Sequence, residues 1–292
     1  MTKNVGDPIQ ADDHRKEPQR PTLPEQAGLH PERNVQLHRF EGGFGFLYDR
    51  YLAKQVQRGP LPTHVAIIMD GNRRFALAGG MERHEGHRRG KEKVREVMRW
   101  CRDFGITYLT VYALSIENLT SRSPEELAIL FDLYASGFHE LAADTEIHRD
   151  QVRCQAMGQL QLLPARVVQA IAAAEQATKD YNALIFTVCL AYGARQELVD
   201  AIKRILTDHT NGRIRLEDIS EELVSQYLYT HDMPDPDLVI RTSGEERVSN
   251  FLLWQLAYAE LCFIDVYWPA FRKRDFLRAI RTYQGRQRRY GT

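Results

Sequence analysis

The sequence predicts an α/β fold in which helices cover both faces of a mostly parallel central sheet. Short apolar segments of strand length alternate with stretches whose apolar residues recur at helical spacing, an order typical of parallel sheets. The first of these segments, Val65–Met69, is continuously apolar, as expected for a strand buried on both faces. No internal repeat and no change of composition divides residues 60–292, so we interpret the fold as a single domain.

The first part of the chain differs from the remainder. Residues 1–34 contain five prolines, many charges and few large apolar side chains. Such a segment buries too little surface to offset the entropy lost on ordering, so we expect a disordered tail before a domain of residues 35–292. Residues 37–56 have a roughly helical apolar period, weakened by three glycines. We expect a helix packed on the domain, with contact to a membrane surface as the alternative.

From residue 64 onward the expected elements follow in order. Val65–Met69 is a continuously apolar strand, residues 94–104 have helical spacing, and Ile106–Leu114 is a second strand. Ser123 then starts a helix, with proline at its first position and Glu126 completing a capping box. Further strands are expected at Val152–Met157, Leu184–Leu190, Leu238–Ile240 and Phe263–Val266, and further helices from Pro164 and from Gln196.

Composition excludes several classes of protein. The 39 basic and 39 acidic side chains cancel, which excludes a uniformly basic nucleic-acid binder, and 43% hydrophobic residues are ordinary for a globular protein. The four cysteines lie far apart in apolar runs, which is typical of neither a metal site nor a disulfide framework. Neither a transmembrane-length apolar segment nor the apolar core of a secretory signal is found. We therefore expect a cytoplasmic protein.

The strongest local feature is an aspartate at the end of the first strand. The apolar run ends in Asp70, followed by Gly71, Asn72, Arg73 and Arg74. Ligands of parallel sheets bind beyond the carboxyl ends of the strands, so Asp70 could hold a hard cation while the arginines grip phosphate oxygens. Gly71 lets the backbone approach a ligand closely. The alternative is an aspartate that caps the next helix beside two solvated arginines.

Two other strands end in polar groups of a complementary kind. Residues 237–249 pass from a strand into Arg241, Ser243, Arg247 and Ser249, an arginine, hydroxyl and glycine set suited to a phosphate. The segment 112–118 ends in a hydroxyl, an acid and an amide. Three such strand ends predict a site for two phosphorylated groups and a divalent metal. Each segment alone is weak evidence for a phosphate site, because residues such as Thr-Ser-Gly are also common in turns.

Several nucleotide and hydrolase motifs are missing. The sequence has no G-x-x-x-x-G-K-[ST], no G-x-G-x-x-G after a strand, no serine nucleophile elbow and no H-E-x-x-H. A haloacid-dehalogenase phosphatase would need a second aspartate where Asn72 stands. The only adjacent aspartate pair, Asp12-Asp13, lies in the tail and lacks the spacing of helical prenyl synthases.

The chain resembles the cis-prenyltransferase family, of the undecaprenyl diphosphate synthase kind. The resemblance runs from about residue 64 to residue 291 and is carried by five blocks in the family's order: HVAIIMDGNRR from His64, GHRRG from Gly86, SIEN from Ser115, DLVIRTSGE from Asp237 and SNFLLWQLAYAEL from Ser249. It implies repeated Mg²⁺-dependent condensation of isopentenyl diphosphate onto an allylic diphosphate with a new Z double bond. It also implies a homodimer and an apolar tunnel for the product, and the lipid product would bring the protein to the membrane surface.

The resemblance also implies residue roles. Asp70 is the essential aspartate that holds Mg²⁺ against the allylic diphosphate, and Asn118 is the second catalytic residue, expected to orient the substrate. Glu260 is a second magnesium-associated carboxylate, often supplied by the partner subunit. The allylic diphosphate is expected to contact Gly71, Asn72, Arg73, Arg74, Phe75, Arg83 and His87. The cradle of the isopentenyl diphosphate is expected to contain Arg241, Arg247 and Ser249, and Arg289 and Gly291 of a C-terminal R-x-G would complete that site in the partner subunit. Further substrate contacts are expected at Ser115, Ile116, Glu117, Leu119, Arg122 and Val248.

Several positions depart from the bacterial pattern. Phe75 and Leu119 replace usual tryptophans, Ser243 replaces a frequent glycine, and an apparent extra residue before Pro124 leaves the match of Arg122 open. The long N-terminal region is more similar to archaeal or eukaryotic relatives. The two tryptophan replacements affect packing of the prenyl chain, so they bear on the choice of allylic primer, farnesyl or geranylgeranyl diphosphate, rather than on the reaction.

The alternative function is a non-catalytic partner subunit of the same family. Such partners typically lose the strand-end aspartate and the arginines of the diphosphate loop, whereas this chain keeps Asp70, Arg74, Arg241 and Arg247. A phosphate-ester hydrolase would need a nucleophile that the motifs do not supply. A cis-prenyl chain-elongating enzyme is therefore the expected function, with a long polyprenyl product because the small Ala113 would stand at the tunnel mouth. The candidate tunnel wall is the apolar stripe of Leu127, Leu130, Phe131, Tyr134 and Phe138, and the alternative is that these side chains fill a solid core, the commoner use of such a stripe.

Overall fold

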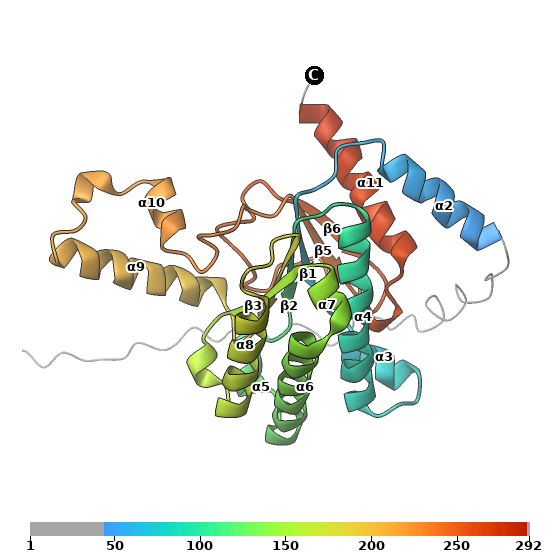
Figure 1. The fold of residues 1–292 in the computed structure, drawn as a ribbon, viewed down its shortest axis with the longest axis horizontal. Coiled ribbons are helices and arrows are strands. Elements are labelled where there is room, and N and C mark those ends of the chain that lie inside the picture. The colour runs from blue at the N-terminus through green and yellow to red at the C-terminus, as the bar shows by residue number, and fades with distance from the viewer. Residues whose placement is uncertain (1–43, 291–292) are drawn as a thin grey trace, which may run out of the picture. The chain divides into compact units, whose positions relative to one another are not determined.

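The computed structural model describes residues 44–290, with side chains for residues 47–286 (Figure 1). All of these residues belong to one compact unit. Its centre is a parallel sheet of six strands in the order β3-β4-β2-β1-β5-β6. The expected tail of residues 1–34 and Gly291 lie outside the described residues. The α/β class and the parallel sheet are thus confirmed.

The strands lie close to their predicted positions with one exception. They are β1 (His64–Ile68), β2 (Tyr108–Tyr112), β3 (Val152–Met157), β4 (Leu184–Cys189), β5 (Leu238–Thr242) and β6 (Glu260–Ile264). β6 begins three residues before the expected Phe263, so that boundary was wrong. Pairing with β5 sets the start, since Glu260 lies opposite Leu238, and a charged first residue hid the strand in the sequence pattern.

Helices connect most of the strands. The helices are α2 (Phe44–Val56), α3 (Asn72–Ala78), α4 (Arg83–Asp103), α5 (Asn118–Ser121), α6 (Pro124–Ala143), α7 (Thr145–Arg149), α8 (Ala165–Thr178), α9 (Ala194–Thr210), α10 (Glu221–Gln226) and α11 (Lys273–Tyr290). Two of the predicted helix starts lie within one residue of their expected positions, at Pro124 for α6 and Ala165 for α8. Short 3₁₀ turns are η2 (Leu160–Leu162), η3 (Leu216–Asp218) and η4 (Trp268–Ala270). The hydroxyl of Ser123 caps α6 by accepting the backbone N–H of Glu126, as predicted.

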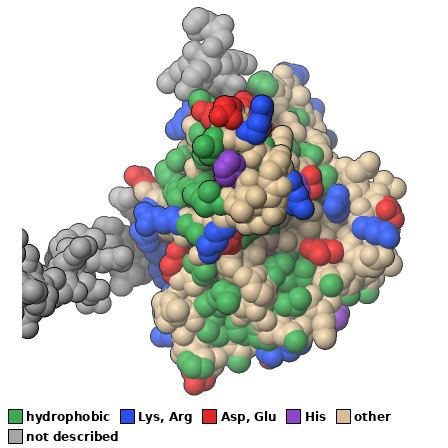
Figure 2. Space-filling model, turned by 90° about the vertical axis from the view of Figure 1, so that its left-hand side faces the viewer, with side chains coloured by type: hydrophobic (Ala, Val, Ile, Leu, Met, Phe, Trp, Pro, Cys, Tyr) green, Lys and Arg blue, Asp and Glu red, His purple; other side chains and the backbone are tan. Residues whose placement is uncertain are grey.

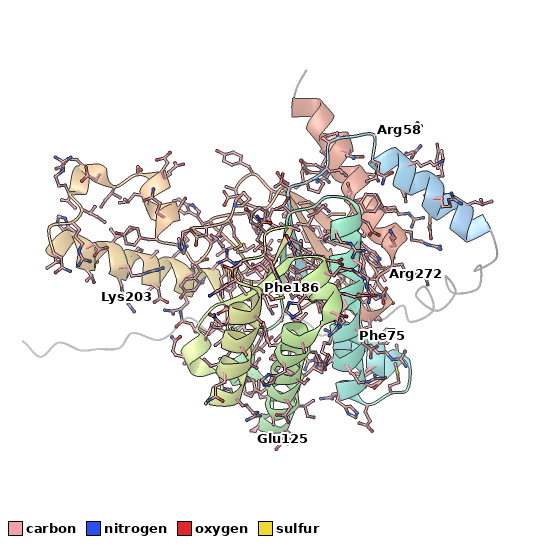
Figure 3. The ribbon with its side chains drawn as sticks, in the orientation of Figure 1. Arg58, Phe75, Glu125, Phe186, Lys203 and Arg272 are labelled. Atoms are coloured by element: carbon pink, nitrogen blue, oxygen red, sulfur yellow. The ribbon has the colours of Figure 1, made fainter. Side chains whose placement is uncertain are left out.

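The two faces of the sheet are covered differently. Along β1, Val65 and Ile67 face the larger core, which also contains residues of α4, α6, α8 and α11, with Phe186 at the centre of the molecule (Figure 3). Ala66 and Ile68 face a smaller core of aromatic and aliphatic side chains. That second face is covered by the start of α9 and by residues 243–259, which form turns rather than a helix. Helices therefore cover mainly one face, because a loop rich in large apolar side chains covers the other.

Helix α2 packs against α11, as expected from its apolar period. Leu52 and Val56 are fully buried, and the side-chain amide of Gln284 donates to the carbonyl oxygens of Val56 at 2.7 Å and of Pro60 at 3.0 Å. Among the residues the structure describes, no helix is long and apolar enough to cross a membrane.

Helices α9 and α10 project from the body as an arm, with Lys203 on α9 directed outward (Figures 1 and 3). Val199, Ile202 and Leu206 lie at helical spacing on α9 and are 44–55% exposed. Figure 2 views the molecule from the side of the arm, where apolar side chains gather in patches between charged ones. A solvent-facing apolar stripe of this kind is typical of an interface.

The strand order creates a crevice at one edge of the sheet. The chain passes from β1 to β2 on one side and later returns to place β5 on the other side of β1. The connections leaving these strands therefore diverge at their carboxyl ends, and ligands of open α/β sheets bind at such a switch point.

Candidate active site

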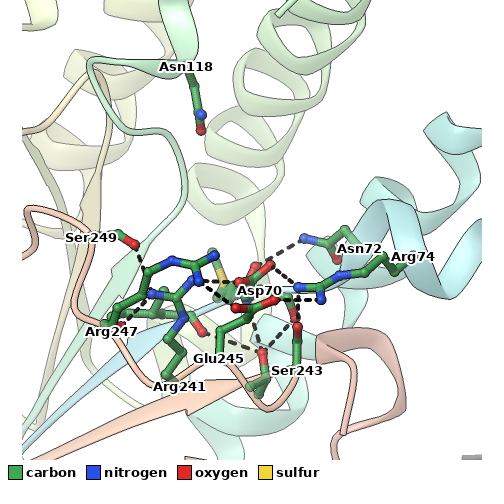
Figure 4. A network of polar contacts seen from close by, with 12 residues as sticks. Asp70, Asn72, Arg74, Asn118, Arg241, Ser243, Glu245, Arg247 and Ser249 are labelled. Carbon is green, nitrogen blue, oxygen red and sulfur yellow. Dashed lines mark hydrogen bonds and ion pairs between the residues drawn. The ribbon is translucent and has the colours of Figure 1, made fainter. Parts of the chain in front are cut away.

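Asp70 lies just beyond the end of β1, at the switch point, between two arginines (Figure 4). Its Oδ2 accepts a hydrogen bond from Nη2 of Arg241 at 2.7 Å, and its Oδ1 accepts one from Nη2 of Arg74 at 3.1 Å. Burial alone would raise the pKa of Asp70, but the Arg241 hydrogen bond and the charges of Arg74 and Arg241 outweigh burial and lower it. Asp70 is therefore a carboxylate at neutral pH.

Local backbone geometry brings these groups together. Gly71 has a left-handed φ of 100°, and a Cβ there would come within 2.7 Å of a ring carbon of Tyr267. Helix α3 starts at Asn72, so Arg74 lies one helical turn after Asp70 and its side chain returns to it. The hydroxyl of Thr242 donates to the Asp70 carbonyl oxygen at 2.7 Å, which fixes the loop after β1 to the end of β5.

Arg241 at the end of β5 holds the second loop of the site. Its side chain is 4% exposed, and its Nη1 donates to Oγ of Ser249 at 2.8 Å and to the backbone carbonyl of Arg247. Glu245 accepts from Arg74 at 2.9 Å and from Arg247 at 2.5 Å. The sequence motif contained Glu245, but its role as the bridge between the two arginines was not predicted.

Ser243 explains one departure from the family pattern. Its φ is 80°, a conformation that favours glycine, so the glycine frequent at this position has a backbone reason. Here the serine hydroxyl accepts a hydrogen bond from Arg74 instead. The substitution thus adds a further partner to the arginine that contacts Asp70.

The segment after β2 lies on the other side of the site. Oγ of Ser115 accepts the Asn118 backbone N–H at 3.2 Å, and Glu117 accepts from the Asn250 amide at 2.8 Å. Oδ1 of Asn118 accepts from Arg122 at 3.3 Å, and the Asn118 amide is directed toward the Asp70 network without touching it (Figure 4). Asp70 and Asn118, the two expected catalytic residues, therefore face each other across a space.

A second polar cluster surrounds Glu126 of α6. Its carboxylate receives a 2.6 Å hydrogen bond from Arg122 and lies 3.5 Å from Nε2 of His87 and 3.6 Å from Arg73. The predicted capping box is therefore incomplete, because the Glu126 side chain faces the site while only Ser123 caps the helix. Burial, together with the Arg122 charge, lowers the pKa of His87 to about 4 against the opposing effect of Glu126, so the imidazole is neutral at pH 7.

Two cavities meet at this point. The polar cavity has a volume of about 960 Å³ and is lined mainly by residues of the first strand-end cluster, with Arg83, Glu245 and Arg247. The apolar cavity, of about 870 Å³, lies between the sheet and helices α4 and α6. Four residues line both cavities: Met69, Asn72, His87 and Arg122. The site therefore has a cationic half continuous with a hydrophobic half.

The apolar cavity contains part of the predicted wall. Ala113 lines it together with Leu130, Tyr134 and Phe138 of α6. The Tyr134 hydroxyl donates to the Ala113 carbonyl oxygen at 3.0 Å, so the two residues are adjacent. Leu127 and Phe131 were also expected in the wall but lie outside the cavity lining, because only one side of α6 faces the sheet.

Other predicted contacts lie beside the cavities. The predicted residues that line the polar cavity are Asp70, Gly71, Asn72, Arg73, Arg74, Arg83, His87, Arg122 and Arg247. Neither cavity lining includes Phe75, Ser115, Ile116, Glu117, Leu119, Val248 or Ser249. Phe75 instead packs under the Arg89 guanidinium, 5.9 Å from its ring centre. The side chain of Arg289 and all of Gly291 fall outside the described residues, so their roles stay predictions.

Glu260 does not join Asp70 within one chain. It is the first residue of β6, opposite Leu238 at the amino end of β5, whereas Asp70 follows the carboxyl end of β1. Its carboxylate accepts from Arg286 of α11 at 2.6 Å. Within one chain, the parallel register places Glu260 and Asp70 at opposite ends of the sheet, so the magnesium-associated role of Glu260 stays a prediction that needs the partner subunit.

The donor set fits magnesium held jointly with a substrate. Across the described residues, no group of three or more His, Cys, Asp or Glu side chains is arranged to bind a metal. Asp70 supplies one hard carboxylate that lines the polar cavity and is 26% exposed. Mg²⁺ is commonly held by one or two carboxylates together with substrate phosphates, so a single aspartate in an arginine-rich cavity fits this ion.

Comparisons with known proteins agree with this arrangement. The family model for undecaprenyl diphosphate synthase matches residues 68–291. A Methanocaldococcus jannaschii protein named tritrans,polycis-undecaprenyl-diphosphate synthase (geranylgeranyl-diphosphate specific) is 51% identical over 261 residues, 88% of this chain and 93% of the relative. A Methanopyrus kandleri protein of the same name is 54% identical over 245 residues, 84% of this chain and 90% of the relative. The crystal structure of lavandulyl diphosphate synthase from Lavandula x intermedia with dimethylallyl diphosphate has a TM-score of 0.72 and 34% identity, over 79% of this chain and 96% of that one.

Proposed function

The chain belongs to the undecaprenyl diphosphate synthase family of cis-prenyltransferases and is a prenyl-transferring enzyme, and on this premise we propose its substrates and product. It condenses isopentenyl diphosphate repeatedly onto an allylic diphosphate, with Mg²⁺, to give a long Z-polyprenyl diphosphate that serves as a lipid-carrier precursor. Geranylgeranyl diphosphate is the proposed primer, because the archaeal relatives named above are specific for it.

One observation carries this proposal: a cationic cavity and an apolar cavity lie next to each other and share lining residues. An allylic diphosphate has the same two halves, a polyanionic head and a hydrocarbon chain. Four residues, Met69, Asn72, His87 and Arg122, line both cavities and would lie at the junction of head and chain. Arginine forks bind phosphate oxygens bidentately, and burial of the hydrocarbon is favourable in the apolar half.

The residues of the site suit ionisation of the allylic diphosphate. Arg74 lines the polar cavity and is held by Asp70, so its remaining N–H groups require little reorganisation to meet negative charge on the departing diphosphate. Arg241 lines neither cavity, and it would hold Asp70 in place beside the isopentenyl diphosphate cradle. Bound Mg²⁺ would supply further positive charge at those oxygens. The Asn118 amide is too weak a base to remove the proton that leaves after carbon–carbon bond formation. Asn118 would orient the isopentenyl group while a diphosphate oxygen accepts the proton.

The direct test measures incorporation of labelled isopentenyl diphosphate. Purified protein is incubated with Mg²⁺ and either farnesyl or geranylgeranyl diphosphate, and the products are sized by chromatography. We expect long products, formed faster with geranylgeranyl diphosphate. Absence of incorporation in every mixture would favour the non-catalytic partner subunit, and release of inorganic phosphate alone would favour a hydrolase.

The length of the product should depend on Ala113. We expect Ala113→Leu to shift products to shorter chains while the first condensation stays within a few-fold of wild type, because added bulk in a close-packed lining obstructs the chain. Chromatographic sizing of the products measures the shift. Ala128→Leu, on the exposed side of the same helix α6, is the control and should leave the length distribution unchanged. An unchanged distribution in Ala113→Leu would refute the assignment of the apolar cavity as the product tunnel.

We further propose a homodimer that uses the arm of α9 and α10. The stripe of Val199, Ile202 and Leu206 supports this proposal because isolated helices rarely leave such a face in water. In a dimer, Glu260 and the C-terminal Arg289 and Gly291 would be available to the partner's site. We also propose that the protein is cytoplasmic and touches the membrane through its lipid product.

Ile202→Asp should convert the dimer to a monomer. A buried carboxylate at an apolar interface is strongly unfavourable, so the apparent mass in light scattering after gel filtration should fall by about half. The control is Ile129→Asp, the same substitution at an isoleucine of α6 that is 45% exposed, and it should leave the mass unchanged. A wild-type monomer would contradict the homodimer, whereas an unchanged mass in Ile202→Asp would move the interface elsewhere.

A further inference from the structure

Helix α4 is joined to α6 and α7 by a row of ion pairs. Four basic residues, Lys91, Arg95, Arg99 and Arg102, recur along one side of α4, three or four residues apart. Their partners across the gap are Glu140, Asp144, Glu146 and Asp150. We call this row the seam.

The first half of the seam forms a connected network rather than separate pairs. Lys91 donates to Glu140 at 2.7 Å, and Arg95 donates to the same carboxylate at 3.3 Å. Arg95 also donates to Asp144, which in turn caps α7 through the N–H of Glu146 at 2.8 Å. The Arg95 guanidinium is therefore pinned between the end of α6 and the start of α7.

Beneath the seam lie two separate cavities that share two lining residues. The apolar cavity of about 870 Å³ includes Lys91, Arg95, Met98 and Glu140 in its lining. A second, smaller cavity lies under the remainder of the seam, and its volume is about 350 Å³ when the part open to solvent is included. Its lining also includes Arg95 and Met98, together with Ile147 and Val152. Arg95 and Met98 are thus the side chains at the boundary between the two cavities.

We propose that Arg95, pinned by Glu140 and Asp144 and packed beside Met98, is the floor that limits how far the prenyl chain extends. This inference rests on the proposed function and assigns the chain-length limit to a residue pair. The first cavity has a limited volume, about 870 Å³ even when the part open to solvent is included. A polyprenyl chain outgrows such a volume, so its tip reaches the floor during elongation.

The chemistry of the floor opposes passage of a hydrocarbon. The Arg95 side chain is 32% exposed and Asp144 is 15% exposed, so both are partly withdrawn from water. A chain that moved past Arg95 would break its hydrogen bonds and leave the carboxylates beside hydrocarbon, which is unfavourable for any charged group. Beyond the floor, Ile147 and Val152 are apolar and buried, so a chain that passed would enter a compatible space.

Arg95→Ala tests the floor by joining the two cavities. We expect the most abundant product to lengthen by about one isoprene unit or more, consistent with the added space. Arg95→Lys, which keeps a long cation, should retain most of the wild-type distribution. Arg102→Ala is the matched control, because Arg102 makes a similar seam pair with Asp150 but lines only the second cavity. Its product lengths should equal those of wild type.

A double variant tests whether the longer chain enters the second cavity. Ile147→Phe fills that cavity and should not change product length by itself, yet it should reverse the lengthening in Arg95→Ala. Lengthening by Arg102→Ala as well, or unchanged lengths in Arg95→Ala, would overturn the proposal. Thermal unfolding of each variant identifies any loss of fold, and Arg95→Gln, which conserves bulk better than alanine, is then used in place of an unstable Arg95→Ala.

A binding measurement separates this inference from the proposed function. Prenyl alcohols that increase by one isoprene unit undergo no condensation, so their affinity reports only the space available. For wild type, affinity should rise with length until the chain reaches the floor and then level off, and in Arg95→Ala the plateau should begin at a longer alcohol. A shifted plateau without elongation would support the floor and reject the enzyme function. Elongation with an unshifted plateau would support the enzyme function and reject the floor.

Discussion

Replacement of Asp70 by alanine should lower turnover on the order of 1000-fold or more, the largest effect that we expect of any single change. Asp70 fixes Arg74 and Arg241 and lines the polar cavity as its hard-oxygen donor. Its loss removes the metal-facing carboxylate and one partner of each guanidinium group. Initial rates of labelled isopentenyl diphosphate incorporation at saturating Mg²⁺ measure the effect.

Two further variants make this result specific. Asp70→Asn keeps the shape and some hydrogen bonding of the side chain, so a comparable loss would assign the effect to charge. Asp132→Ala removes an exposed carboxylate that pairs only with Arg166 in the described region and should leave the rate unchanged. If soluble Asp70→Ala retained roughly a tenth of the wild-type rate, the metal-bridging role would be wrong.

Arg241→Ala should lower kcat/KM about 100-fold or more. The buried guanidinium donates to Asp70, Ser249 and the Arg247 carbonyl, and charge-assisted hydrogen bonds contribute roughly 1.5–3 kcal/mol each. Arg241→Lys keeps the charge but loses the fork that reaches both loops, so we expect an intermediate loss. The exposed Arg213→Ala serves as the control.

The pH profile gives Arg241→Ala a second readout. Arg241 helps to lower the pKa of Asp70, so its removal should raise that pKa toward or above the ordinary value. Activity needs the ionised carboxylate, and the acid limb of kcat/KM should therefore move to higher pH in the variant. An acid limb that does not move would mean that Arg241 binds substrate without acting on Asp70.

The strand-end clusters were predictable because each depends on local order. An apolar run followed by Asp70, or by Arg241, places that residue at the carboxyl edge of any parallel sheet. The position of Glu260 was not predictable in this way, because it depends on the register of β6 against β5. The sequence of one strand does not predict its register, because register also depends on which strand pairs with it.

Two other features depended on contacts distant in the sequence. Glu126 fits a capping box equally well whether or not its carboxylate returns to the backbone, and only the folded chain brings Arg73 and His87 beside that carboxylate. The cover on the second face of the sheet has neither helical nor strand period, since residues 243–259 are turns held by buried apolar side chains such as Phe251 and Leu252. Periodicity cannot reveal such a layer.

The pairing of Asp70 with Arg241 also has a consequence for biosynthesis. The two residues are 171 positions apart, and their strands are central neighbours in the sheet. A nascent chain therefore exposes β1 and β2 long before β5 emerges from the ribosome to cover the open side of β1. Parallel pairings between distant segments form slowly and leave unpaired strand edges prone to association. Substrate-binding competence should thus appear as a single late event, and ribosome-bound fragments that end before residue 241 should depend on chaperones to avoid aggregation.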